Sequence, residues 1–142
     1  MTAEELWKQS GLTGQYEAWS FGGNPDKLAE LVKHGIKTAT CSALELYELK
    51  KEPIPKQGDY SVILDSADRA VCIIRTTRVY IETFDRVSAE HAFKEGEGDR
   101  SLEYWRRVHI DFFTDEFCAE KLVFHEKIKL ICEEFELVFV SS

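Results

Sequence analysis

The chain has 142 residues, of which 44% are apolar and 12% aromatic, a composition typical of one globular domain with a real hydrophobic core and not of a disordered protein. Its formal net charge of −8 argues against tight, sequence-blind binding along an extended nucleic acid, because such binding needs a broad basic surface. No apolar run approaches the roughly 20 residues that span a bilayer, and the acidic N-terminus lacks the layout of a signal peptide. We therefore expect a cytoplasmic protein with no membrane partner.

The first residues of the chain carry a helix signal. Thr2 and Glu5 form a capping box, in which each side chain satisfies a backbone N–H of the first helical turn. This pattern predicts a short helix over about residues 3–10, within an N-terminal helical segment of about residues 1–23.

Two further helix starts follow. Asn24 before Pro25 is an N-cap followed by proline at the first helical position, and Gly35 suits the position just after that helix ends. Ser42 with Glu45 predicts a second capping box and a third helix.

The second half of the chain alternates between strand and helix signals. β-Branched runs predict a hairpin of two strands, and a final stretch of alternating apolar and acidic residues predicts a half-buried strand. The expected strands cover residues 60–64, 70–82 and 127–140, and helices begin after Ser88 and after Asp99 or Ser101. Strands separated by unequal helices, without a regular βαβ rhythm, indicate an α+β fold with a small barrel or curled sheet.

A lysine and a threonine stand three residues apart after the second helix. In the run from Gly35 to Thr40, Lys37 could act as a base or as a cationic anchor for an oxyanion, and would activate the hydroxyl of Thr40. The alternative is a solvated lysine beside a threonine that caps a turn. Cys41 follows with no local base, which leaves a catalytic thiol open as a further reading.

Three carboxylates and an arginine crowd a glycine-rich segment, Glu95-Gly96-Glu97-Gly98-Asp99-Arg100. Crowded carboxylates raise one another's pKa and so favour general acid–base chemistry, and their oxygens can also hold Mg²⁺ or Mn²⁺. In the structural alternative Asp99 is an N-cap, Glu97 is solvated and Arg100 neutralises the patch. The glycines make this loop costly to order for structure alone, which favours a site.

Other polar and aromatic residues have structural interpretations. His91 and His109 lie on apolar helix faces and are expected to be partly buried, and no metal-binding histidine spacing is present. Trp105 is either a core residue or a platform that stacks on a base. The four cysteines form no CxxC pair and are expected to be reduced.

The motifs together resemble a known family. The run from Lys37 to Ser42, the segment Gly58-Asp59-Tyr60, the strand Val71 to Thr77 and the segment Glu95 to Arg106 are similar to the ASCH domain superfamily, and in particular to its bacterial DUF984 branch. The resemblance covers about residues 19–139 and implies a PUA-like fold, a small β-barrel with helices packed around a cleft. It implies a single domain over residues 1–142.

The resemblance also implies a site. One small bacterial class of this superfamily hydrolyses the acetamide of N4-acetylcytidine with a lysine, a threonine and a glutamate, which fall here on Lys37, Thr40 and Glu95. Those enzymes carry an arginine two residues after the threonine. Ser42 occupies that position in this chain, which departs there from the pattern of the cytidine enzymes.

We therefore predict a small hydrolase of a modified nucleoside or related amide, with Thr40 as nucleophile, Lys37 as its activator and Glu95 as proton shuttle. The expected substrate-binding residues are Ser42, Arg75, Arg100 and Trp105. One alternative is an endonuclease for short single-stranded RNA, with a divalent metal added by Glu97 and Asp99; otherwise no cofactor is expected. The other alternative is a non-catalytic module that binds RNA or a nucleotide.

Overall fold

The computed structural model describes residues 1–141. Along the chain the elements are α1 (Ala3–Ser10), β1 (Glu17–Trp19), α2 (Pro25–Lys33), β2 (Ala39–Ala43), α3 (Leu44–Lys50), β3 (Tyr60–Leu64), β4 (Ala70–Thr83), the 3₁₀ turn η1 (Phe84–Arg86), α4 (Ala89–Glu95), α5 (Leu102–Ala119) and β5 (Lys129–Val140). No helix within residues 1–141 combines the length and the apolar character needed to cross a membrane.

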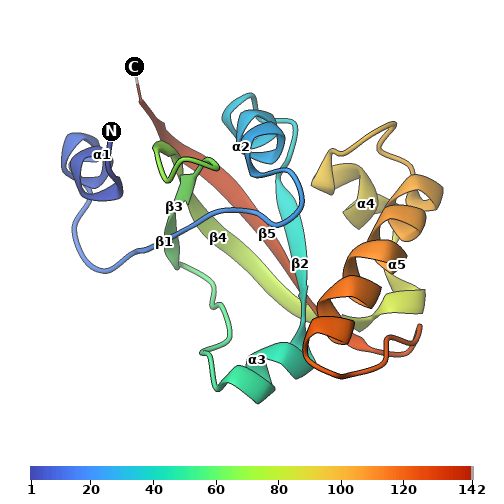
Figure 1. Cartoon of the computed structure of the whole chain (residues 1–142). Helices are drawn as coiled ribbons and strands as arrows, with labels where there is room; N and C mark the ends of the chain where they lie inside the picture. The colour runs from blue at the N-terminus through green and yellow to red at the C-terminus, as the bar shows by residue number, and fades with distance from the viewer. Residues whose placement is uncertain (142) are drawn as a thin grey trace.

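The strands form one mixed sheet with the order β1-β3-β4-β5-β2. β1 runs parallel to β3, and every other neighbouring pair is antiparallel. β4 and β5 are long and their pairing shifts register twice, near Ile73 and near Thr76. Such bulges bend a strand and increase its twist, and the sheet accordingly curls into a half-barrel with β1 and β2 at its edges (Figure 1). The α+β class with a curled sheet is confirmed.

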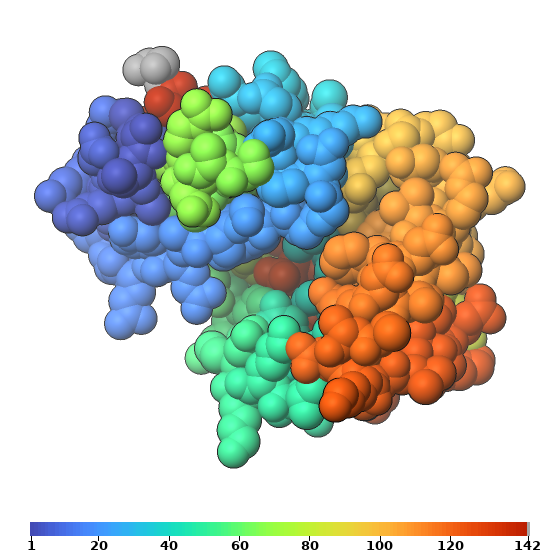
Figure 2. Space-filling view, viewed as in Figure 1, coloured from blue at the N-terminus to red at the C-terminus, as the bar shows by residue number. Residues whose placement is uncertain are grey.

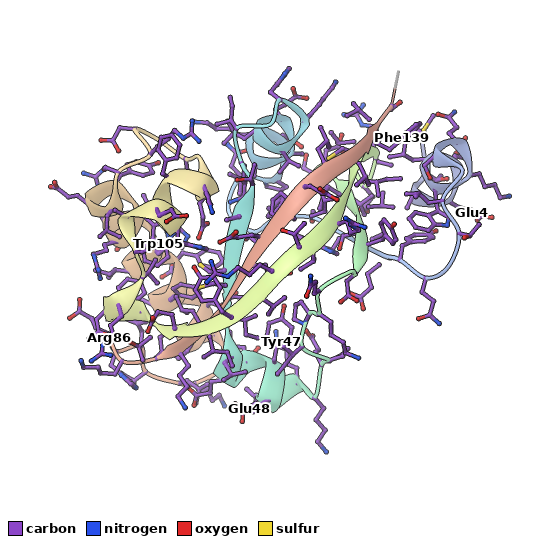
Figure 3. The ribbon with its side chains drawn as sticks, turned by 180° about the vertical axis from the view of Figure 1, so that it is seen from behind. Glu4, Tyr47, Glu48, Arg86, Trp105 and Phe139 are labelled. Carbon is purple, nitrogen blue, oxygen red and sulfur yellow. The ribbon has the colours of Figure 1, made fainter. Side chains whose placement is uncertain are left out.

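Helices cover this sheet on several sides (Figure 1). α1 packs against β3 and β4, and α2 lies over the centre of the sheet. A larger core of aromatic and aliphatic side chains joins α4 and α5 to β2 and β5. In the view from behind, Trp105 on α5 lies to one side of the sheet and Tyr47 on α3 lies below it (Figure 3).

The helix-start predictions have mixed outcomes. The capping box of Thr2 with Glu5 and the Asn24 N-cap are both present. The capping box at Ser42 is wrong: Ser42 lies in β2, opposite Ile131 of β5, and Ala43 caps α3 without a side-chain hydrogen bond. Pairing with a distant strand here overrides a local helix signal.

The helical prediction for the N-terminal segment holds only for α1. That helix ends at Ser10, and Gly11 follows it in the left-handed conformation. Residues 17–19 then form β1, which pairs with β3 through Ala18 opposite Val62. The chain between α1 and α2 thus forms one edge of the half-barrel and leads directly to the cavities described below.

Candidate functional site

The loop between α2 and β2 carries Lys37 into the interior. Gly35 takes a left-handed φ of 74°, and the backbone N–H groups of Ile36 and Lys37 both donate to the carbonyl of Leu31, at 2.9 and 3.1 Å. The next amide, Thr38, donates to the carbonyl of Lys94 at 2.7 Å. These bonds fasten the loop to the ends of α2 and α4, and leave Lys37 only 2% exposed.

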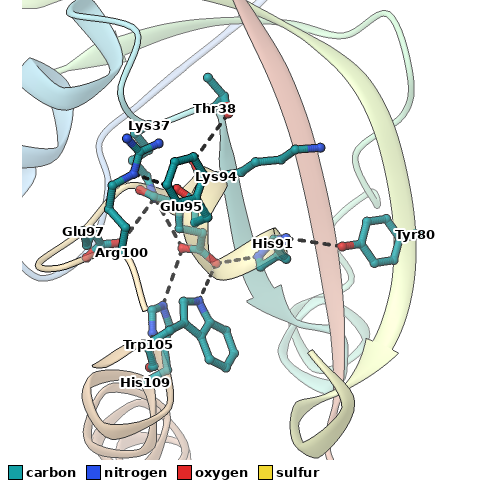
Figure 4. Close-up of polar contacts among 11 residues, drawn as sticks. Lys37, Thr38, Tyr80, His91, Lys94, Glu95, Glu97, Arg100, Trp105 and His109 are labelled. Atoms are coloured by element: carbon teal, nitrogen blue, oxygen red, sulfur yellow. Dashed lines mark hydrogen bonds and ion pairs between the residues drawn. The ribbon is translucent and has the colours of Figure 1, made fainter. Parts of the chain in front are cut away.

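The Lys37 ammonium is bound by the segment that the sequence singled out. Nζ donates to the Glu95 backbone carbonyl, to Glu95 Oε1 and to Glu97 Oε2, each at 3.3 Å (Figure 4). Three acceptors match the three N–H donors of an ammonium group. The Phe21 ring lies beside it, with its centroid 5.3 Å from Nζ. Lys37 is therefore held as a buried cation between two carboxylates.

Glu95, the last residue of α4, receives donors on both carboxylate oxygens. Lys37 and His109 Nε2 approach Oε1, at 3.3 and 3.6 Å. His91 Nε2 and Trp105 Nε1 lie 2.6 and 2.8 Å from Oε2. A carboxylate satisfied in this way tolerates being only 1% exposed.

These donors set the charge of the site. Burial by itself would raise the pKa of Glu95, but the charge of Lys37 and the hydrogen bonds from His109 and His91 outweigh it, and hold that pKa well below its usual value. Glu95 is consequently ionised at neutral pH. A carboxylate with a strongly lowered pKa is a weak base, so its main effect is to hold the cations around it.

His109 is the site residue whose role the sequence analysis missed. Its Nδ1 lies 2.8 Å from the carbonyl of Trp105, which fixes Nδ1 as the protonated donor and leaves Nε2 facing Glu95. Burial lowers the pKa of His109, but the hydrogen bond and the charge of Glu95 raise it further, and the net direction is upward. The sequence placed His109 on an apolar helix face, which is correct but does not reveal its carboxylate partner.

Gly96 allows the loop and the helix to meet. It follows Glu95 with a left-handed φ of 75°, and a Cβ at this position would lie 2.6 Å from the carbonyl oxygen of Ile36. The backbone that carries Lys37 therefore approaches α4 more closely than any side chain permits. The glycines of this segment serve close approach, since a Cβ on Gly98 would likewise lie 2.4 Å from the Tyr104 ring.

Gly96→Ala is expected to destabilise the protein and to separate Lys37 from Glu95. Gly11→Ala is the matched control, because Gly11 has nearly the same φ, 74°, with nothing within 4 Å of its added Cβ. We expect Gly96→Ala to lower the free energy of unfolding by about 1–3 kcal/mol more than Gly11→Ala, the usual cost of overpacking. Chemical denaturation of both variants measures the difference, and equal losses would contradict this role of Gly96.

Two cavities meet at this site. The smaller, about 320 Å³, is lined by Lys37, Thr40, Cys41, Glu95, Glu97 and His109 together with aromatic side chains. The larger, about 1130 Å³, shares Thr40 and Cys41 with it. The space-filling view shows a hollow between the N-terminal segment, the region of α3 and α5, with the red of β5 visible inside it (Figure 2). The smaller volume lies within the range of small-molecule pockets, and the larger exceeds what such a ligand needs.

The structure brings together the three residues expected to be catalytic. Lys37, Thr40 and Glu95 all line the smaller cavity, Lys37 and Glu95 in direct contact. Thr40 lies in β2 opposite Glu133 of β5.

The four expected substrate-binding residues are more scattered. Ser42 lines the larger cavity, where its hydroxyl donates to that of Tyr47 at 3.4 Å. Trp105 is only 2% exposed and donates to Glu95. Arg75 lies outside the lining of both cavities and pairs with Glu136 at 2.7 Å. Arg100 also lies outside; it stacks on Phe93 and donates to two backbone carbonyls.

Cys41 lines both cavities but is poorly suited to act as a nucleophile. Burial raises the pKa of its thiol well above the ordinary value, and the negative charge of Glu95 raises it further. The thiolate is the reactive form of cysteine. At neutral pH the thiol therefore stays protonated, and Thr40 is the better candidate on this strand.

Among residues 1–141, two groups of side chains have the donor atoms of a metal site, Cys41 with His91 and Glu95, and Glu95 with Glu97 and His109. Lys37 donates to both Glu95 and Glu97, so its ammonium already occupies the position between the carboxylates that a divalent ion would take. Asp99 is exposed and accepts from the backbone N–H of Ser101. The donor set thus fits a fixed lysine cation better than Mg²⁺ or Mn²⁺.

Comparisons with known proteins agree with this fold. The family model for the ASCH domain matches residues 17–139. An ASCH domain from Lactobacillus crispatus JV V101 superposes with a TM-score of 0.90 at 28% identity, covering 96% of this chain and 93% of that one. A protein from Enterococcus faecalis V583 described under DUF984 gives 0.86 at 35% identity, covering 96% and 85%. A ZmASCH mutant from Zymomonas mobilis shares the fold, with a TM-score of 0.53 at 11% identity over 86% and 70% of the two chains. No curated protein matches the chain.

Proposed function

We propose that this chain, which belongs to the ASCH domain family and has its PUA-like fold, is a hydrolase. Its substrate in this proposal is an amide carried by a modified nucleoside, of the N4-acetylcytidine type. The observation that carries the proposal is the Lys37–Glu95 ion pair, which is buried at 1% and 2% side-chain exposure yet lines a cavity that also holds Thr40 and His109. Strongly perturbed charged groups in a concave site are typical of catalytic centres.

Thr40 is the nucleophile in this proposal. Its hydroxyl oxygen attacks the amide carbonyl carbon, and a tetrahedral oxyanion forms beside the Lys37 ammonium, which stabilises the negative charge. Glu97 is the exchangeable partner of Lys37, because its side chain is 21% exposed. The substrate carbonyl oxygen replaces it on Nζ.

His109 transfers the proton of the Thr40 hydroxyl, and Glu95 supports it. Because the pKa of Glu95 is strongly lowered, we assign the transfer to His109, with Glu95 as the carboxylate that orients the ring and stabilises its cation. In the neutral ring Nδ1 of His109 carries the proton, which it donates to the Trp105 carbonyl, so Nε2 takes the proton of Thr40. The cation that forms faces Glu95 Oε1, and Nε2 gives the proton to the amide nitrogen as the C–N bond breaks. Water then hydrolyses the Thr40 ester with His109 again as base, which releases the acid and restores the hydroxyl.

The two alternative functions, an endonuclease and an RNA-binding module, require a positively charged cleft, and a hydrolase of a neutral nucleoside does not. An endonuclease or an RNA-binding module must hold phosphates, and so needs cations along its cleft. The larger cavity is instead lined by five carboxylates and a single lysine, Lys56. This acidic lining supports a small neutral or cationic ligand over an RNA backbone.

The test is turnover of N4-acetylcytidine. Purified protein in EDTA is incubated with the nucleoside, and the release of cytidine is followed by liquid chromatography. We expect release by the wild type that Thr40→Val abolishes, since valine keeps the shape of the side chain without its hydroxyl. If the wild type releases no cytidine, the proposed substrate is wrong. Cleavage of single-stranded RNA by the same preparation would then favour the endonuclease.

Cys41→Ser is expected to keep most of this activity, because the thiol is protonated at neutral pH and takes no part in the proposed steps. The activity of the wild type should also survive iodoacetamide at pH 7, because alkylation requires the thiolate and the exposed Cys118 lies outside both cavities. A serine variant with less than a tenth of the wild-type kcat/KM, a loss of about 1.4 kcal/mol, would identify Cys41 as a participant and displace Thr40.

A further inference from the structure

The larger cavity has a charge that the proposed reaction does not explain. Its lining includes five carboxylates against one lysine: Glu17, Glu52, Asp59, Glu116, Glu133 and Lys56. A concave surface of one sign concentrates ions of the opposite sign. The cavity therefore attracts cations and repels phosphates.

Glu133 stands out among these carboxylates because it is only 9% exposed. Within residues 1–141 no hydrogen bond or ion pair joins its carboxyl group to another side chain or to the backbone, whereas its neighbour Glu134 pairs with Arg78 and Lys94. No fully buried side-chain oxygen or nitrogen in the described chain lacks a partner. The Glu133 oxygens must therefore keep an opening, and the larger cavity, which Glu133 lines, provides it.

The environment of this carboxyl group makes it costly to ionise. Burial raises its pKa to about 7, and the negative charges of Asp59 and Glu17 add to the effect. A buried carboxyl without a partner is rare, because such groups are normally paired or hydrogen-bonded. A cation bound in the cavity would supply the missing partner.

Aromatic side chains form much of the remaining wall. They are Tyr16, Trp19, Phe21, Tyr47, Tyr60 and Phe112. The face of an aromatic ring attracts an organic cation and also buries its apolar body. Aromatic walls around an unpaired carboxyl are thus suited to an organic ammonium or amidinium ion more than to a hydrated inorganic one.

We propose that the larger cavity is a binding site for a small organic cation, an ammonium or amidinium group on an apolar body, with Glu133 as the carboxylate that pairs with it. Thr40 lies opposite Glu133 in the sheet and lines both cavities, so a ligand held there lies next to the cavity of the Lys37 site. The proposal concerns binding and stands whether or not the Lys37 site is hydrolytic.

The test uses benzamidinium and its uncharged isostere benzamide as probes. Calorimetric titration of the wild type at pH 8.5, where Glu133 is charged, should show benzamidinium binding at least about tenfold more tightly than benzamide. A charge-assisted hydrogen bond contributes roughly this discrimination. Glu133→Gln, which keeps the shape of the side chain, should remove the preference.

Glu126→Gln is the matched control, since it removes the same charge from an exposed residue outside both cavities. It should bind both probes as the wild type does. Amide chemical-shift changes on titration should map to Thr40, Thr76 and Glu133. Equal affinity of the wild type for the two probes, including no binding of either, would overturn the proposal, as would a preference that survives Glu133→Gln.

Discussion

Glu95→Gln is expected to lower kcat/KM by roughly 10²–10⁴-fold, the range for the loss of general acid–base function. Glutamine keeps the size of the side chain but removes the charge that holds Lys37 and His109 in place. Without the carboxylate the histidine cation is no longer stabilised, so the loss should appear in kcat and the pH profile should shift to lower pH. Steady-state kinetics across pH measures both effects.

The same substitution should also destabilise the fold. Both oxygens of Glu95 accept from donors: Lys37 and His109 approach one, and His91 and Trp105 approach the other. A glutamine amide has only one oxygen. In either orientation of the amide its NH₂ group therefore faces donors instead of acceptors. Breaking a buried ion pair by removing one partner costs about 3–5 kcal/mol. Chemical denaturation should show a loss of this size.

Glu97→Gln tests whether the two carboxylates that accept hydrogen bonds from Lys37 have different roles. Glu97 is partly exposed and forms its ion pair with Lys37, which keeps Glu95 as a second partner, so the loss of Glu97 should cost less than about 1 kcal/mol and leave kcat within a few fold of the wild type. If Glu97→Gln and Glu95→Gln lower activity equally, the special role of Glu95 is wrong.

Local signals along the chain were predictable and non-local ones were not. The caps at Thr2 and Asn24 depend on residues three positions apart, which a sequence displays directly. The strand β2 depends on pairing with β5, as in Cys41 opposite Cys132, and no local pattern contains that information. The local pattern at Ser42 therefore predicts a helix cap, whereas Ser42 lies in β2 and α3 begins only at Leu44.

The candidate site shows the same division. Lys37, Thr40 and Glu95 stand out by residue type and spacing, and the resemblance to a family assigns them roles; the fold brings all three to one cavity. Arg75 is predicted to bind substrate, but residues alternate faces along a strand and its side chain pairs with Glu136, outside the lining of both cavities.

The sequence signals the burial of Glu133 but not its lack of a partner. Glu133 and Glu134 are adjacent in β5, so alternation puts Glu133 on the face of Phe135 and Glu134 on the opposite face, where Glu134 pairs with two basic residues. Its burial arises from the curl of the sheet and from the segments that close over it. Only the assembled fold makes one glutamate of this strand unlike the others.

Glu133→Gln is expected to stabilise the free protein, and increasingly so as the pH rises. The carboxyl of Glu133 has the ordinary pKa of 4.5 in the unfolded chain and a pKa of about 7 in the folded chain. Between pH 4.5 and pH 7 the folded state therefore binds more protons than the unfolded state. Stability therefore falls as the pH rises from about 4.5 to about 7, by about 3 kcal/mol in total. Glutamine does not titrate and avoids this loss.

Unfolding free energies measured at pH 4.5 and pH 8.5 test this expectation. The gain of Glu133→Gln over the wild type should be about 3 kcal/mol larger at the higher pH, whereas Glu126→Gln should show little change between the two. Titrations of groups such as His109, common to both proteins, cancel in the comparison. A gain that is independent of pH would mean that the carboxyl is already paired or solvated.

A stabilising substitution at a buried position carries a functional implication. If glutamine at position 133 raises stability at pH 8.5 while removing the preference for benzamidinium, the carboxyl of Glu133 lowers the stability of the empty protein and gains its partner only from a ligand. Benzamidinium should then stabilise the wild type against unfolding and leave Glu133→Gln unaffected, because a ligand stabilises the state that binds it. Stability and binding at this residue would thus be opposed, as they commonly are at functional sites.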